Sequence, residues 1–155
     1  MIDEGTWEKI RIHLPDDTDQ SIIEQVHLRE EQADYFLSKR GDLKWFYPLK
    51  ILGFFDVEKA PYPVPAEKEG LFTIPQWNVL PYLERVSEQI TTSENNEYIE
   101  ELLEIIKGVS EYRDENGEHK DNYRTWWFFV KILANLPNES VSLNMIEYAE
   151  VWLNS

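Results

Sequence analysis

The chain has 155 residues, of which 30 are Asp or Glu and 15 are Lys or Arg, so its formal net charge is -15. This charge argues against binding to nucleic acid or to anionic membrane surfaces, both of which attract Lys- or Arg-rich faces. The absence of cysteine excludes disulfide bridges, thiolate zinc sites and cysteine nucleophiles.

The N-terminal part, residues 1–53, is predicted to be helical. Residues 1–15 fit either a short helix or an extended arm, and the pattern leaves both open. The run Asp16–Asp19 supplies N-cap candidates for a helix expected over Asp19–Lys39. Gly41 is expected to end this helix as a C′ glycine.

A short helix is expected next, over Asp42–Leu52, with Asp42 as its cap and Pro48 limiting its length. Residues 54–74 follow, and alternating prolines exclude helix there: Pro61, Pro63 and Pro65. This pattern favours an extended, polyproline-like strap that packs on the domain through its aromatic neighbours. A long irregular segment is also often functional, so a ligand site beneath it stays open.

Residues 75–155 contain two predicted helix–turn–helix units. The first covers Pro75–Ile90 and Asn96–Tyr112, and the second covers Asp121–Leu136 and Val141–Leu153. Their first helices start 46 residues apart, within the period of about 40–47 residues that is typical of HEAT and armadillo repeats. The predicted fold class is all-α: a single domain of HEAT/armadillo-like stacked helical hairpins with an irregular proline-rich strap.

Two of these helices have distinctive faces. The helix over Asn96–Tyr112 has apolar residues at i, i+3/i+4 spacing, and an acidic cluster lies opposite: Glu100, Glu101 and Glu104. Paired carboxylates can catalyse proton transfer or bind a divalent ion, but their position opposite the apolar stripe favours an exposed, solubilising face. The helix over Asp121–Leu136 is apolar nearly all round, which predicts burial between other elements.

Three stretches carry a resemblance: KWFYPLKILGFFD at Lys44–Asp56, TIPQWNVLPYL at Thr73–Leu83 and DNYRTWW at Asp121–Trp127. Over roughly residues 42–155 the chain resembles the N-terminal HEAT-like helical region of large uncharacterised bacterial proteins. The resemblance implies an interaction module attached to other domains, and it carries no functional residue across.

The last expected helix presents Trp152 and Leu153, whereas a terminal repeat usually has a polar outer face. Three explanations stay open. The chain is the N-terminal piece of a longer polypeptide, or these residues form an oligomer contact, or the helix packs inward on the N-terminal half. Trp152 and Leu153 are therefore candidate interaction residues.

Asn122 and Arg124 form a polar edge on an otherwise apolar helix. An Arg in this position pairs with a carboxylate of the preceding hairpin or recognises an anionic ligand, and we favour the locking of hairpin to hairpin. Four tryptophans are expected in the core rather than in a ligand groove: Trp45, Trp77, Trp126 and Trp127.

No catalytic or cofactor motif is evident. The three histidines, His13, His27 and His119, fall in separate elements without metal-ligand spacing. The run Asp114–Asp121 lacks the twelve-residue pattern and final Glu of a calcium loop, and no phosphate loop or Gly-x-Ser-x-Gly occurs. We therefore expect no catalytic residue, metal or cofactor.

The predicted function is a non-enzymatic scaffold or regulatory module for protein–protein or inter-domain contacts. One alternative is a small acidic inhibitor that mimics nucleic acid or blocks a basic partner. A third hypothesis is an enzyme whose site combines the proline-rich segment with the Asp121–Arg124 edge, which requires a polar cavity with perturbed pKa values. We expect a cytoplasmic location, because signal-peptide and membrane-span patterns are missing.

Overall fold

The computed structural model describes residues 1–65, 72–90, 95–117 and 122–153. Within these ranges the chain forms eight α-helices and one short antiparallel strand pair, which confirms the predicted helical class. The elements, in chain order, are α1 (Glu4–His13), α2 (Asp17–Leu28), α3 (Glu30–Lys39), α4 (Phe46–Ile51), β1 (Val64–Pro65), β2 (Phe72–Thr73), α5 (Leu80–Gln89), α6 (Asn96–Glu111), α7 (Tyr123–Asn135) and α8 (Leu143–Leu153).

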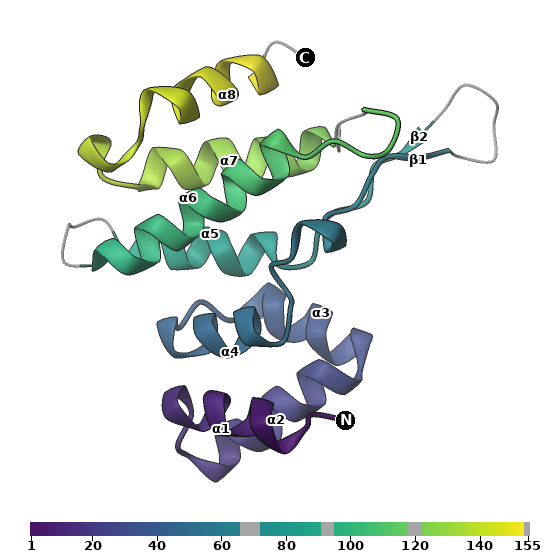
Figure 1. Ribbon diagram of the computed structural model, residues 1–155, viewed down its shortest axis with the longest axis vertical. Coiled ribbons are helices and arrows are strands. Elements are labelled where there is room, and N and C mark those ends of the chain that lie inside the picture. The colour runs from purple at the N-terminus through teal and green to yellow at the C-terminus, as the bar shows by residue number, and fades with distance from the viewer. Residues whose placement is uncertain (66–71, 91–94, 118–121, 154–155) are drawn as a thin grey trace.

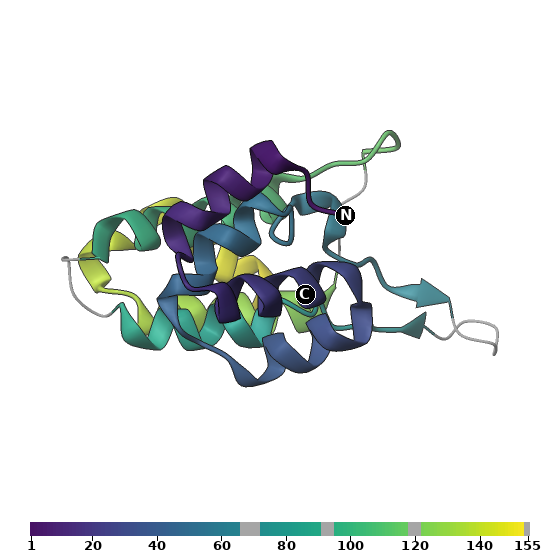
Figure 2. The same cartoon turned by 90° about the horizontal axis from the view of Figure 1, so that it is seen from below.

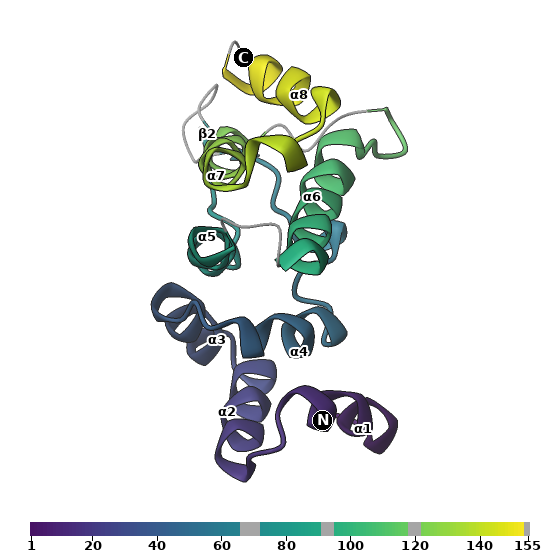
Figure 3. The same cartoon turned by 90° about the vertical axis from the view of Figure 1, so that its left-hand side faces the viewer.

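The helices follow one another along the long axis, from α1 and α2 at one end to α8 at the other (Figure 1). Viewed along the helix axes, α3, α5 and α7 form one column, and α4 and α6 lie beside it (Figure 3). Helix contacts run along this column, from α3 to α5 and from α5 to α7, and others join α1 to α4, α2 to α3 and α7 to α8. Strands β1 and β2 project sideways from the helices (Figure 2).

The first 15 residues resolve into a helix rather than an extended arm. Asp3 is the N-cap of α1, and its carboxylate accepts the Thr6 N–H at 2.8 Å. The same type of cap starts α2, where the Asp16 carboxylate accepts the Thr18 N–H at 2.7 Å. The sequence-predicted start at Asp19 is therefore two residues late.

The single helix expected over Asp19–Lys39 is wrong, because the chain breaks at Arg29. Arg29 has extended backbone angles (φ -130°, ψ 117°) and separates α2 from α3. The two helices pack against each other and bury different sets of residues: Ile23 and Val26 from α2, and Ala33, Phe36 and Leu37 from α3. Because of the break, each helix directs its own short apolar stripe toward the core. A single straight helix with a polar middle would not place both stripes there.

Gly41 follows the C-cap Arg40 and so occupies the expected C′ position, but it does not adopt the left-handed conformation that usually favours glycine there. Positive φ occurs, among described residues, only at Gly53 and Gly117, whereas Gly41 lies against α5. A Cβ placed on Gly41 would lie 2.6 Å from the Cβ of Arg85. The Arg85 guanidinium donates to the Leu37 carbonyl at 3.2 Å, so α5 closes over the C-terminal end of α3.

Asp42 does not cap the following helix through its side chain. A 3-10 turn over Leu43–Trp45 leads into α4, and the Asp42 carbonyl instead accepts a 2.7 Å hydrogen bond from the Tyr82 hydroxyl. Burial of Tyr82 raises the pKa of its hydroxyl far above the ordinary tyrosine value. This bond therefore ties the start of the α4 region to the interior of α5.

The first helix of the expected hairpin pair starts at Leu80 rather than at Pro75, because Pro81 takes an early position in α5, where a proline needs no N–H partner. Likewise α7 starts at Tyr123, with Asn122 rather than Asp121 as its N-cap; Asp121 lies outside the described residues. Helices α5 and α7 thus begin 43 residues apart. α5 packs chiefly on α7, and only slightly on its hairpin partner α6.

The predicted strap contains more regular structure than expected. A 3-10 turn covers Val57–Lys59, and β1 pairs with β2 so that Val64 lies opposite Thr73. The stretch between β1 and β2 lies outside the described residues, and the polyproline-like conformation stays a prediction. The segment therefore combines a turn with the two arms of a strand pair.

Polar side chains link helices along each side of the stack. On one side the Asn135 amide of α7 donates to the Ser87 hydroxyl of α5 at 3.1 Å. On the other side Tyr148 of α8 donates to Glu111 of α6 at 2.6 Å, and this hydrogen bond raises the pKa of Tyr148. Glu101 of α6 pairs with Lys50 of α4 at 2.6 Å. Glu101 is thus not part of a purely solubilising face, whereas Glu100 and Glu104 are exposed.

Candidate functional site

A groove of about 590 Å³ lies on α7 and against the end of α8; we call it the α7 groove. Aromatic side chains dominate its lining: Gln76, Tyr123, Arg124, Trp126, Trp127, Phe128, Val130 and Trp152. Trp127 is 55% exposed and Tyr123 is also exposed. The prediction that α7 is buried on all sides, and Trp127 with it, is therefore wrong.

Trp152 does not form an exposed end, as the sequence suggested. It is only 7% exposed, and its ring stacks on Trp126 with centroids 5.3 Å apart. Phe129 and Tyr148 contact the same ring, so α8 does pack inward, but on α7 rather than on the N-terminal half of the chain. The side chain of Leu153 lies outside what the structure describes. Of the four tryptophans expected in the core, Trp45, Trp77 and Trp126 are buried.

The α7 groove has a local charge opposite to that of the whole chain. No carboxylate belongs to its described lining, although Asp and Glu outnumber Lys and Arg by two to one overall. The guanidinium of Arg124 has no ion pair with any described residue. The Lys131 ammonium lies 4.9 Å from the Phe128 ring centroid, beside the same surface. The groove therefore combines apolar aromatic walls with two cationic groups.

Asn122 lies behind this groove and is fully buried. Its side-chain oxygen accepts the N–H groups of Arg124 and Thr125 at 3.0 and 3.3 Å. Its amide nitrogen donates to the carbonyls of Pro61 and Pro75, at 3.1 and 2.8 Å. One side chain thus caps α7 and holds both ends of the segment that carries β1 and β2.

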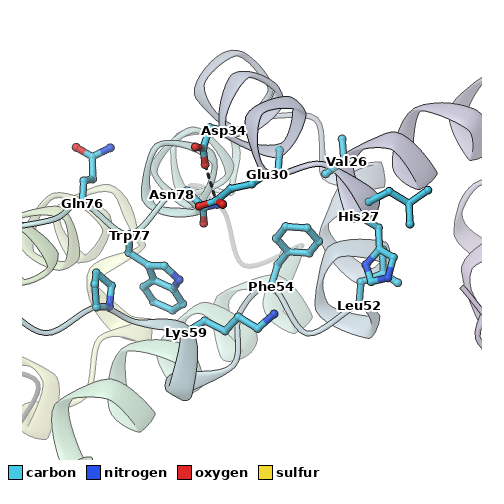
Figure 4. Close-up of a pocket in the computed structure, with 13 residues that line it drawn as sticks. Val26, His27, Glu30, Asp34, Leu52, Phe54, Lys59, Gln76, Trp77 and Asn78 are labelled. Carbon is cyan, nitrogen blue, oxygen red and sulfur yellow. Dashed lines mark hydrogen bonds between the residues drawn. The ribbon is translucent and has the colours of Figure 1, made fainter. Parts of the chain in front are cut away.

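A second concave surface, which we call the α2–α3 cleft, has a volume of about 600 Å³. It lies where α2 and α3 meet the segment after α4 and the residues before α5 (Figure 4). Its lining is polar as well as apolar: Val26, His27, Leu28, Glu30, Ala33, Asp34, Leu52, Phe54, Lys59, Pro61, Gln76, Trp77 and Asn78. Volumes of about 300–1,000 Å³ are usual for small-molecule sites.

Charged groups of the cleft lie on two facing walls. Glu30 and Asp34 project from α3, and Lys59 approaches from the opposite side (Figure 4). Asp34 accepts a hydrogen bond from the Asn78 amide at 3.0 Å. Burial lowers the pKa of His27, and the charges of the N-terminus and Lys59 lower it further, so His27 is neutral at pH 7. Lys59 therefore supplies the positive charge of this surface.

Trp77 forms one end of the cleft and is only 3% exposed. Its Nε1–H has no hydrogen-bond partner among the described residues and is closed off from solvent. Figure 4 shows the edge that carries Nε1 turned toward Lys59 and Phe54. A buried donor without an acceptor destabilises a protein by about 1–3 kcal/mol. A ligand oxygen that accepted from this N–H would remove that cost.

Sequence reasoning found one of these surfaces only in part. Arg124 and Trp152 do line one groove, although they were singled out for different reasons. The enzyme hypothesis required a polar cavity beneath the proline-rich segment, and Lys59 and Pro61 do line a polar cleft. Arg124 lines the other groove and Asp121 lies outside the described residues, whereas Asn122 of the same edge contacts the segment through the Pro61 carbonyl. In the sequence, Trp77 lies between two prolines in the stretch IPQWNVLP. This was the one feature that could have pointed to a functional role for Trp77.

The two histidines in the described ranges lie in different surroundings. His13 stacks on Tyr47 with ring centroids 5.0 Å apart, and His27 lies in the α2–α3 cleft. His119 lies outside the described residues, as does the second half of the calcium-like run Asp114–Asp121. In the part that the structure describes, no three His, Asp or Glu side chains group closely enough to hold a metal ion.

No helix in the described ranges is long and apolar enough to cross a membrane. Comparisons with protein-family models, with curated proteins and with solved structures gave no match to this chain.

Proposed function

We propose that the protein is a non-enzymatic scaffold that binds an apolar segment of another protein in the α7 groove. The single observation that carries this proposal is the groove itself, where exposed Trp127 and Tyr123 border an aromatic hollow, and Arg124 has no ion pair with any described residue. Tryptophan, tyrosine and arginine are the residues that most often dominate binding energy at protein interfaces.

The arrangement of helices supports a HEAT- or armadillo-like stack as the architecture of this scaffold. The column α3–α5–α7 and the 43-residue spacing of α5 and α7 are consistent with paired-helix repeats of about 40–47 residues. Such stacks present extended surfaces on which partners bind. In this proposal the α7 groove lies at one end of the stack, and the resemblance to HEAT-like regions of larger bacterial proteins fits the same role.

The charge of the groove indicates the chemistry of the partner. A segment with a large apolar side chain fills the aromatic hollow, and a neighbouring carboxylate pairs with Arg124. A basic segment would instead meet Arg124 and Lys131, and like charges at an interface are strongly unfavourable. We therefore propose an apolar segment with one Asp or Glu, from a separate protein.

The test is selection of peptides from a random display library on the wild-type chain. We expect enriched peptides to share an apolar anchor and an acidic residue. Their affinity should fall at least about tenfold for Trp127→Ala and for Arg124→Ala, because central aromatic and Arg contacts dominate such interfaces. The control is Tyr35→Ala, since Tyr35 is 68% exposed on α3, far from the groove along the chain.

Three outcomes would contradict the proposal: no peptide that depends on Trp127, peptides that lose affinity equally with Tyr35→Ala, or self-association that Trp127→Ala abolishes. The last result would make a second copy of this chain the occupant of the groove. Sedimentation of the wild type and of Trp127→Ala distinguishes it from binding to another protein.

The acidic inhibitor is a second candidate, favoured by the net charge of -15 and by the exposed carboxylates of α6, Glu97, Glu100 and Glu104. It differs in its response to salt. Binding of a basic partner to these carboxylates should weaken steeply between about 50 and 300 mM salt, whereas groove binding that rests on apolar contacts should change little. Titration of a lysine-rich peptide at both salt concentrations separates the two.

A further inference from the structure

The α2–α3 cleft is separate from the α7 groove in its chemistry, and it holds opposite charges on facing walls. Glu30 and Asp34 lie on the α3 wall, and Lys59 lies across from them (Figure 4). Neither Glu30 nor Lys59 has an ion pair with any residue that the structure describes. Phe54 lies between the two walls and offers an apolar surface.

Trp77 supplies an independent indication of a ligand. Its indole N–H is buried, is turned into the cleft and has no acceptor among the described residues. Buried polar groups in native proteins are nearly always hydrogen-bonded, and an exception calls for a specific explanation. Lys59 lies on the side of the cleft toward which this N–H is turned, so a ligand oxygen that accepts from the N–H would also approach a positive charge (Figure 4).

We propose that the α2–α3 cleft binds a small zwitterion, such as an α-amino acid with an apolar side chain. Its carboxylate accepts from Trp77 Nε1–H and Lys59, its ammonium pairs with Glu30 and Asp34, and its apolar part lies on Phe54. A ligand with only a negative charge would face two carboxylates without compensation. A ligand with only a positive charge would leave the Trp77 N–H without an acceptor.

The experiment is a titration of the full ¹⁵N-labelled chain, followed through the six tryptophan indole N–H resonances. The spectrum of Trp77→Phe assigns the Trp77 resonance. The probe is L-phenylalanine at up to about 10 mM. Two matched compounds each lack one charge: 2-phenylethylamine has no carboxylate, and 3-phenylpropanoate has no ammonium group. We expect L-phenylalanine to shift the Trp77 resonance and each matched compound to bind at least about tenfold more weakly.

Charge-removing variants identify the contacts. Lys59→Met should weaken L-phenylalanine about tenfold and leave 2-phenylethylamine unchanged, and Glu30→Gln should weaken L-phenylalanine and leave 3-phenylpropanoate unchanged. Lys107→Met and Glu139→Gln are the controls, because both residues are exposed and neither lines the cleft. All four positions are exposed, so the variants should fold, and circular dichroism checks that they do.

A Trp77 resonance that none of the three compounds moves would overturn the proposal. So would equal shifts by all three, because charge would then play no part in binding. Neither result bears on the peptide-binding proposal, since Trp127 and Arg124 lie in the other groove.

Discussion

The rings of Trp126 and Trp152 lie stacked, with planes 2° from parallel, and this contact joins α8 to α7. We expect Trp152→Ala to lower the free energy of unfolding by about 3–5 kcal/mol, because it removes a buried indole and leaves a cavity between the helices. Urea unfolding followed by circular dichroism measures the change. The matched control is Trp127→Ala, where the ring is 55% exposed and the loss should stay near 0.5 kcal/mol, as is usual for surface positions. Equal losses for both variants would mean that α8 does not pack as described.

Asn122 should be needed for more than its N-cap. Loss of a cap alone costs about 1 kcal/mol, whereas Asn122→Ala also leaves the carbonyls of Pro61 and Pro75 without their donor. We expect a total loss of about 2–4 kcal/mol in unfolding free energy. Asn122→Asp separates the two roles, because it keeps the capping acceptor and replaces the donor with an oxygen. An Asp variant as stable as the wild type would show that the two carbonyl contacts contribute nothing.

Two glycines should respond in opposite directions to the same substitution. Gly41→Ala brings a methyl group against Arg85, so it should destabilise the protein by about 1–3 kcal/mol. Gly108 lies in α6 with open space around its Cβ position, so Gly108→Ala should stabilise by about 0.5–1 kcal/mol through helix propensity. Thermal melting of the two variants tests this contrast. A Gly41→Ala variant that melts at or above the wild-type temperature would contradict the close packing of α3 on α5.

Tyr82 should make stability depend on alkaline pH. Its burial raises the pKa of the hydroxyl in the folded state, so the unfolded chain, with an ordinary pKa near 10.0, loses this proton first. The contribution of Tyr82 is therefore full below pH 10 and is lost as pH rises above it, by about 1.4 kcal/mol per pH unit. Tyr82→Phe should lose about 1 kcal/mol at pH 7 with the hydrogen bond to Asp42, and it should show a shallower decline above pH 10. Urea unfolding of both proteins at pH 7 and about pH 11 measures the two slopes. Parallel slopes would contradict the prediction.

The helical class and the most regular helix were predictable because they depend on local patterns. α6 was expected over Asn96–Tyr112 and runs over Asn96–Glu111, since its apolar residues keep helical spacing throughout. The break at Arg29 was not predictable in the same way. It depends on which faces of α2 and α3 the rest of the protein covers, and propensity alone does not decide that.

The two concave surfaces were harder to predict, because their residues come from distant parts of the chain. His27, Lys59 and Trp77 lie in three separate segments, and contacts between distant elements bring them together: α2 with α3, α3 with α5, and the Val57–Lys59 turn with α6. The exposure of Trp152 was wrongly inferred because α8 has apolar residues on both faces. Met145 and Trp152 are buried, whereas Leu143 and Ile146 are exposed, and composition does not distinguish the two faces.

Gln76 belongs to the lining of both the α2–α3 cleft and the α7 groove. The Gln76 side chain has one conformation at a time. A molecule that hydrogen-bonds to its amide in one of these two surfaces therefore changes the position of the amide in the other. Thermodynamic linkage makes any such coupling reciprocal: a change in the affinity of one surface implies an equal change in the affinity of the other. If both proposals are combined, we expect a small ligand in the α2–α3 cleft to change the affinity of the α7 groove for its partner, and we expect Gln76→Ala to reduce this coupling without removing either surface.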